Sequence, residues 1–132
     1  MPGHWDVLVA SSDMEERRSL VRVCEGMSMN VISCNGLSQA EEVLARQAVG
    51  IVFCDENLSD GSYRDLLTAR KDRKNGPRIV VTSRTWDWEE YLEAMRLGAF
   101  DVVRRPWHPT DVEMVVLSAM REDLQDRERL IA

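Results

Sequence analysis

The sequence predicts an α/β fold: one doubly wound sheet of five parallel strands in the order 2-1-3-4-5, with two helices on one face and three on the other. Two observations support this class. Five short runs of β-branched and other apolar residues recur along the 132-residue chain, and a segment with helical spacing of its apolar residues follows each run. Strands that alternate with helices of this length pair in parallel through right-handed connections.

The five predicted strands are short and mostly apolar. They cover residues 5–10, 30–34, 50–54, 78–82 and 100–104. Continuous apolar runs, such as IVF at 51–53, are typical of parallel strands that are covered on both faces. This pattern is the reason for expecting helices on both sides of the sheet.

The five predicted helices begin and end at residues with known capping preferences. Asp13 and Ser38 are placed to act as N-caps of the first two helices. Gly26 ends the first helix, and Pro109 suits the first turn of the fifth. The predicted spans are Asp13 to Gly26, Ser38 to about Ala48, about Ser62 to Arg73, about Asp87 to Leu97, and Pro109 toward the chain end.

Composition and charge fit one globular domain and exclude several functions. With 44% apolar and 30% charged residues, we expect a single domain over 1–132, with its core at about 5–120 and a helical C-terminal extension at 121–132. The formal charge of −6, with scattered basic residues, argues against direct nucleic-acid binding. No signal peptide is visible and no apolar run approaches the ~20 residues that span a bilayer, so we expect a cytoplasmic protein without membrane contact. Three cysteines without CxxC spacing favour reduced thiols.

Polar side chains gather where the predicted strands end. In an open parallel sheet, reaction sites lie beyond the carboxyl ends of the strands. A carboxylate there can act as a nucleophile while a hydroxyl and a cation hold phosphoryl oxygens, so the set predicts phosphoryl chemistry. The residues are Ser11, Ser12 and Asp13 after the first strand, Asp55, Glu56 and Asn57 after the third, Thr82 and Ser83 after the fourth, and Arg105 and Pro106 after the fifth.

Four segments in register resemble the receiver domain of bacterial response regulators over nearly the whole chain. They are VLVASSD at 7–13, IVFCDENLSDG at 51–61, IVVTS at 79–83 and RLGAFDVVRRPW at 96–107. The resemblance implies a flavodoxin-like fold, a role in two-component phosphorelay signalling and no independent metabolic reaction. It also implies two kinds of partner: a histidine kinase or phosphotransfer protein, and an output protein or domain.

The resemblance assigns roles to single residues. Asp55 matches the aspartate that the family phosphorylates, and Thr82 matches its switch hydroxyl. Arg105 and Pro106 match the family's Lys-Pro pair, often joined by a cis peptide bond, which makes Arg105 the expected counter-ion of the phosphate or carboxylate. Asn57 matches the residue whose backbone carbonyl binds the metal.

The resemblance also implies a docking face on the fourth helix, fifth strand and fifth helix. Receivers commonly meet partners there, and a homodimer through this face is one expected use. The residues expected on it are Trp88, Tyr91, Val103 and Met114.

The chain departs from the family's pattern at the metal site. Ser11 and Ser12 align with the family's acidic pair, so both metal-binding carboxylates are replaced by neutral hydroxyls, which are poor ligands for Mg²⁺. Asp13 is also well placed as a helix N-cap. The ligands expected for a weak Mg²⁺ site are Asp55, the Asn57 backbone carbonyl, and Asp13 or Glu56.

Two further departures concern the switch. Arg105 replaces a lysine, and arginine prefers planar, bidentate pairing with a carboxylate. We therefore expect Arg105 to be the nearest cation to Asp55. Val102 stands where the family commonly carries an aromatic ring, so a rotating ring on that strand is absent.

Two alternative functions, and one open question about the C-terminal helix, remain at the level of sequence. A pseudo-receiver would never accept phosphate and would act as a docking surface. A flavodoxin-like electron carrier shares the architecture, but the loop after the first strand, SSDMEERRS, lacks the glycine that flavin phosphate loops use. Leu117, Leu124 and Ile131 recur every seven residues, which fits a solvated helix end, a short coiled-coil arm or a linker to an output domain.

Overall fold

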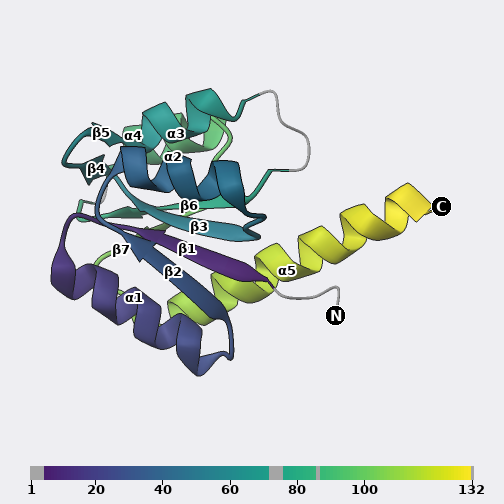
Figure 1. The fold of residues 1–132 in the computed structure, drawn as a ribbon. Coiled ribbons are helices and arrows are strands. Elements are labelled where there is room, and N and C mark those ends of the chain that lie inside the picture. Colours follow the sequence, from purple (N-terminus) through teal and green to yellow (C-terminus); the bar gives the residue numbers. More distant parts are fainter. Residues whose placement is uncertain (1–4, 72–75, 86, 132) are drawn as a thin grey trace.

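The computed structural model describes residues 5–71, 76–85 and 87–131, in which strands and helices alternate as the sequence predicts. Figure 1 shows the arrangement. The elements are β1 (Asp6–Ala10), α1 (Met14–Gly26), β2 (Asn30–Cys34), α2 (Leu37–Arg46), β3 (Ile51–Asp55), β4 (Asn57–Leu58), β5 (Gly61–Ser62), α3 (Tyr63–Ala69), β6 (Arg78–Ser83), α4 (Trp88–Arg96), β7 (Asp101–Arg104) and α5 (Pro109–Ile131).

Five of the strands form one parallel sheet in the order β2-β1-β3-β6-β7. Counted among these five, the order is 2-1-3-4-5, so the predicted topology is confirmed. The sequence did not predict β4 and β5, which are strands of two residues each and form a separate antiparallel hairpin soon after β3. The register of β3 and β6 places Asp55 beside Thr82.

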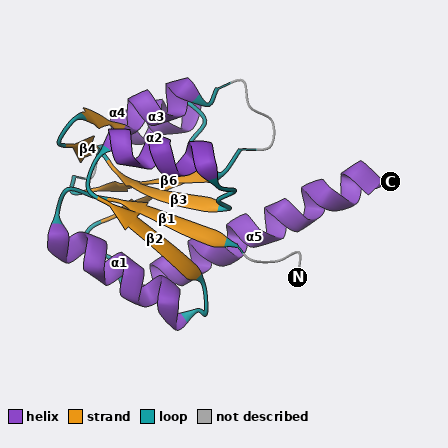
Figure 2. Ribbon diagram, viewed as in Figure 1, coloured by secondary structure: helices purple, strands orange, loops and turns teal. Residues whose placement is uncertain are grey.

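Helices cover both faces of the sheet, which confirms the predicted two-and-three division. Helices α1 and α5 lie on one face, and α2, α3 and α4 lie on the other (Figure 2). Successive residues of a strand point to opposite faces. In β1, Val7 and Val9 therefore join the core under α1 and α5, while Leu8 and Ala10 join the core under the other three helices. No helix among the described residues is long and apolar enough to cross a membrane.

The predicted N-cap of the second helix is wrong. Helix α2 has Gly36 as its N-cap, and Ser38 lies within the first turn. A glycine offers no capping side chain, and the carboxylate of Asp60 replaces it by accepting the backbone N–H groups of Leu37 (2.6 Å) and Ser38 (3.0 Å). These hydrogen bonds hold the pKa of Asp60 below its usual value. The capping group thus comes from the β4–β5 turn, far away in sequence.

The predicted end of the third helix is also wrong. Helix α3 stops at Ala69, where the N–H groups of Arg70 and Lys71 donate to the carbonyls of Leu67 and Thr68, respectively. The predicted end at Arg73 lies outside the described residues. Its start fits better, because Ser62 caps the helix and Asp65 completes a capping box.

Candidate functional site

Asp55 lies at the carboxyl end of β3 and is 3% exposed. Three donors surround its carboxylate. The Thr82 hydroxyl (2.5 Å) and the Arg105 guanidinium (2.5 Å) both donate to Oδ1, and the Ser11 hydroxyl donates to Oδ2 (2.6 Å). A buried carboxylate is costly unless hydrogen bonds and an opposite charge replace its lost water. The fold supplies both, one donor from each of β6, the β7–α5 loop and the β1–α1 loop.

Arg105 divides its donors among three carboxylates. Its Nη2 contacts Asp55, its Nη1 donates to Asp13 (3.4 Å), and its Nε lies 2.9 Å from an oxygen of Glu16. The Nε–H is not aimed at that oxygen, so this last contact is an ion pair without a hydrogen bond. The contact with Asp55 is therefore single and not bidentate. The Arg105–Pro106 peptide bond is cis.

Glu16 is a buried member of the same cluster. Its side chain is 9% exposed, and its second oxygen accepts the indole N–H of Trp107 (2.6 Å). Burial raises the pKa of Glu16 above its usual value, although Trp107 and Arg105 both act to lower it. Sequence reasoning did not identify Glu16 or Trp107 as part of the site, because they are 91 positions apart and Glu16 looked like an ordinary first-turn acid.

Asp13 is the N-cap of α1, as predicted from its type and place. One carboxylate oxygen accepts the backbone N–H groups of Glu15 (3.0 Å) and Glu16 (3.2 Å), and these bonds lower its pKa. The other oxygen accepts Arg84 (2.8 Å) and Arg105. Asp13 therefore connects the start of α1 to two cations at the edge of the sheet. Arg84 is a third residue of the site, after Glu16 and Trp107, that the sequence did not single out.

The two serines that follow β1 have different surroundings. Ser11 is 1% exposed and faces Asp55. Ser12 faces away: its hydroxyl donates to the carbonyl of Asn35 (2.8 Å) and accepts the N–H of Ser59 (2.9 Å). Ser12 thus ties the β1–α1 loop to two neighbouring loops, and only one of the two hydroxyls meets the carboxylate.

Glu56 and Asn57 border a hollow of about 410 Å³ beside Asp55. The carboxylate of Glu56 accepts the Ser83 hydroxyl (3.0 Å) and the backbone N–H of Arg84 (2.9 Å), which holds the β6–α4 loop to the end of β3. Asn57 begins the β4–β5 hairpin and is exposed. Among the described residues, no cluster of three or more Asp, Glu, His or Cys is arranged to hold a metal ion. The full lining is Ser12, Asp13, Asp55, Glu56, Asn57, Arg84 and Arg105.

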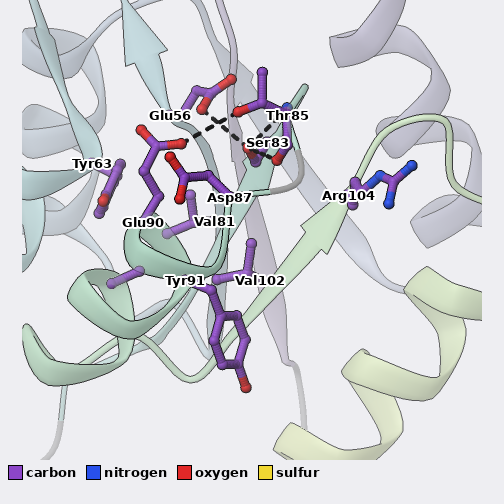
Figure 3. Close-up of a pocket in the computed structure, with 11 residues that line it drawn as sticks. Glu56, Tyr63, Val81, Ser83, Thr85, Asp87, Glu90, Tyr91, Val102 and Arg104 are labelled. Atoms are coloured by element: carbon purple, nitrogen blue, oxygen red, sulfur yellow. Dashed lines mark hydrogen bonds between the residues drawn. The ribbon is translucent and has the colours of Figure 1, made fainter.

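A second, narrower cavity lies between β6, β7 and α4. Its apolar wall includes Val81, Ala94 and Val102, and Figure 3 shows Arg104 pointing away from the other lining residues. The cavity holds about 20 Å³, enough for one water molecule. Tyr63 lines the cavity, and its buried hydroxyl has no hydrogen-bond partner among the described residues. The small Val102 side chain leaves this space unfilled.

The chain matches the family model of the response regulator receiver domain over residues 7–117, and it therefore belongs to this family. Among curated proteins, it is 26% identical to the response regulator protein PilR of Pseudomonas aeruginosa over 110 residues, which cover 83% of this chain and 25% of PilR. It is 25% identical to the acid tolerance regulatory protein ActR of Rhizobium meliloti, covering 92% and 63% of the two chains. This chain thus spans about a quarter of PilR.

Solved receiver domains share the fold. The signal receiver domain of a putative LuxO repressor protein from Vibrio parahaemolyticus superimposes with a TM-score of 0.86 at 15% identity, covering 94% of this chain and 96% of that one. A BeF3-activated DrrB receiver domain gives 0.79 at 18% identity, covering 90% and 99%. Receiver domains are signalling modules of two-component systems that are typically non-catalytic, typically bind Mg²⁺ and pair with histidine kinases. The family match favours signalling over the electron-carrier alternative.

Proposed function

We propose that this chain is a phosphorelay receiver whose phosphoacceptor is Asp55 and whose resting state is held by Arg105 because its Mg²⁺ site is weak. One observation carries the proposal: a buried carboxylate at the end of β3 meets a hydroxyl and a guanidinium beside an open hollow. In the transfer step, a carboxylate oxygen of Asp55 bonds to the phosphorus of the donor. The bond from phosphorus to the donor breaks, and its electron pair leaves with the donor group.

Thr82 and Arg105 have the chemistry to hold the transferred group. A hydroxyl and a fixed cation can bind phosphoryl oxygens and stabilise the charge that develops on them. Both already contact Oδ1 of Asp55. A phosphoryl group bonded to either carboxylate oxygen would therefore lie close to these two donors. Transfer must therefore displace the Arg105 contact, which slows the reaction in the resting state.

The weak Mg²⁺ site follows from the oxygens around the hollow. Mg²⁺ prefers anionic oxygens in octahedral geometry. Both oxygens of Asp13 and both of Glu56 already accept hydrogen bonds within the fold. Ser12 is committed to neighbouring loops, and Ser11 is neutral. These residues do not fit a tight Mg²⁺ site, and millimolar saturation is the expected outcome of a titration.

The test is labelling with acetyl phosphate across a Mg²⁺ series. We expect slow or undetectable labelling of the wild type and a modest gain when Ser11→Asp and Ser12→Asp are combined. Adding Asp55→Ala to that double variant should remove the gain, which controls for labelling elsewhere. Rapid Mg²⁺-dependent labelling of the wild type at Asp55 would refute the weak metal site, and labelling that survives Asp55→Ala would refute the acceptor.

A pseudo-receiver is the second candidate. It is favoured because polar groups of the site already have hydrogen-bond partners within the fold. The Arg105 contact and the committed Ser12 hydroxyl give the edge of the sheet a fixed shape without phosphate. Equal affinity of the wild type and Asp55→Ala for a cognate kinase or output protein, with no labelling, would favour this candidate.

The expected partner surface lies on α4, β7 and α5. Trp88 is 58% exposed and stacks on Tyr91 with ring centroids 5.3 Å apart, and Met114 is 64% exposed. The placement of Val103 on this surface is wrong, because it is 5% exposed and packs in the core under α1 and α5. The neighbouring Val102 points to the α4 side instead. Docking of a kinase, an output protein or a second copy here stays a prediction.

A further inference from the structure

Helix α5 carries an exposed apolar strip beside its buried face. Its buried residues, Val112, Val116 and Ala119, pack under the sheet. Leu117 (49% exposed), Leu124 (59%) and Ile131 (86%) lie roughly a third of a turn away from them, on an exposed side of the helix. A spacing of seven residues keeps side chains on one line of a helix, which is the arrangement of helices that pack against each other.

The outer half of α5 is fixed to the body of the protein. Arg78, at the start of β6, donates to Asp123 (3.3 Å) and Asp126 (2.7 Å). The indole N–H of Trp5 also donates to Asp123 (3.3 Å). Beyond these contacts the helix projects away from the sheet (Figure 1). The strip is therefore presented by a helix whose direction is set by the fold.

Two opposite charges interrupt the strip. Arg121 and Glu128 lie between the apolar residues, so that the strip reads Leu, Arg, Leu, Glu, Ile at positions 117, 121, 124, 128 and 131. Both charged residues are exposed, and the ion pairs found among the described residues involve neither of them. In the reverse direction the strip reads Ile, Glu, Leu, Arg, Leu. Its apolar residues then match those of the forward order, and each charge corresponds to one of opposite sign.

This order is complementary to an antiparallel copy of itself. With a two-fold axis level with residue 124, Leu117 meets Ile131 of the partner subunit, and Leu124 meets the partner's Leu124. Arg121 then lies within one residue's rise, about 1.5 Å, of the level of the partner's Glu128, and the symmetry repeats this pair. In a parallel pair, Arg121 would face the partner's Arg121, and the two glutamates would also meet, so like charges would repel.

We propose that the α5 strip is a docking surface for a second copy of this chain, bound antiparallel through residues 117–131. The overlap is about 21 Å long at ~1.5 Å per residue. A contact between two helices of this length is smaller than the surface that stable dimers usually bury. The dimer should therefore be weak and reversible. It differs from the expected homodimer through α4, β7 and α5, because its centre is Leu124.

Sedimentation velocity over a concentration series of the whole chain tests the surface. We expect a concentration-dependent dimer that Leu124→Glu weakens at least about tenfold, a change of about 1.4 kcal/mol. Leu130→Glu is the matched control, since Leu130 is 79% exposed but lies on another side of the helix. Trp88→Ala should leave this dimer unchanged. A chain that stays monomeric at all concentrations, or a dimer that survives Leu124→Glu, overturns the proposal.

Charge reversal tests the direction of the helices. Arg121→Glu alone and Glu128→Arg alone should each weaken the dimer, and the two together should restore it, because only the antiparallel pairing exchanges the two charges. Cysteine substitution gives an independent test: with an added thiol oxidant, a mixture of Leu117→Cys and Ile131→Cys chains should form the mixed disulfide. Burial raises the pKa of Cys24 to about 12, which keeps this native thiol unreactive. Cross-linking of Leu117→Cys to itself in preference would show a parallel pair and overturn the proposal.

Discussion

Arg105→Met should destabilise the protein far more than Asp55→Asn, although both changes break the same contact. The Arg105 side chain is 15% exposed, and the carboxylates of Asp55 and Glu16 beside it are 5% and 9% exposed. Removal of the cation leaves these two buried carboxylates near each other without a counter-charge. Removal of the Asp55 charge still leaves Arg105 with Glu16 and Asp13. The asymmetry follows from which group is left without a partner.

The expected magnitude comes from the distances and burial of these groups. At an effective dielectric constant of about 20, each close ion pair contributes roughly 4 kcal/mol of attraction. Breaking a buried pair by removing one partner typically costs about 3–5 kcal/mol, because it leaves an uncompensated buried charge. Proton uptake by that group limits the penalty. We expect a loss of about 3 kcal/mol in the free energy of unfolding for Arg105→Met. For Asp55→Asn we expect about 1 kcal/mol or less.

Urea unfolding followed by tryptophan fluorescence measures both effects, with exposed Arg18→Met on α1 as the matched control. The pH dependence adds a second test. Burial already raises the pKa of Glu16, so in Arg105→Met this carboxyl takes up a proton as the pH falls, and the penalty should shrink toward lower pH. Equal losses for Arg105→Met and Asp55→Asn, or a penalty that does not change with pH, would show that Arg105 does not hold this cluster together.

Three further outcomes are expected. Val102→Ile should stabilise the protein by up to about 0.8 kcal/mol in the same unfolding assay, because the added methylene enters the cavity beside α4. A loss of stability would show that the residues around the cavity do not adjust to the larger side chain. Glu16→Gln should remove part of the pH dependence of the free energy of unfolding. Because folding raises the pKa of Glu16, wild-type stability falls as the pH rises above the usual glutamate value of 4.5. The same pH profile in the variant and the wild type would contradict this cause. Asp60→Ala should speed hydrogen exchange at the amides of Leu37 and Ser38, whereas Asp60→Asn should retain part of the protection.

The sequence was sufficient for the sheet because each strand is a local apolar run. The order of the strands follows from their alternation with helices, and the position of Asp55 beside Thr82 follows from both strands ending at the same edge. The cap of α2 did not follow, since Asp60 reaches it from another loop and no local pattern marks that contact. The prediction that Val103 lies on the docking surface failed for another reason: β7 carries two adjacent valines, Val102 and Val103, so the sequence does not tell which of the two points to which face of the sheet.

The site was predicted as a set of strand ends but not as a network. Asp55, Thr82, Ser11 and Arg105 meet because each lies at or just beyond the carboxyl end of one of four neighbouring parallel strands. Glu16 and Trp107 meet only because α1 and the β7–α5 loop pack side by side, and neither residue type at its position signals that contact. Long-range pairs of this kind depend on helix placement, which single-sequence patterns do not specify.

The network has a consequence for how phosphorylation would act. Two cations, Arg84 and Arg105, are shared among the carboxylates of Asp13, Glu16 and Asp55. A phosphoryl group on Asp55 adds negative charge and acceptor oxygens at the same place. It would draw Arg105 more strongly and weaken the guanidinium's contacts with Asp13 and Glu16. Because Asp13 caps α1 and Glu16 lies in its first turn, the start of α1 is the segment whose stability should respond first. Faster amide exchange at the first turn of α1 on phosphorylation, with the outer turns of α5 unchanged, is therefore the expected signature, and an unchanged α1 would argue against coupling through Arg105.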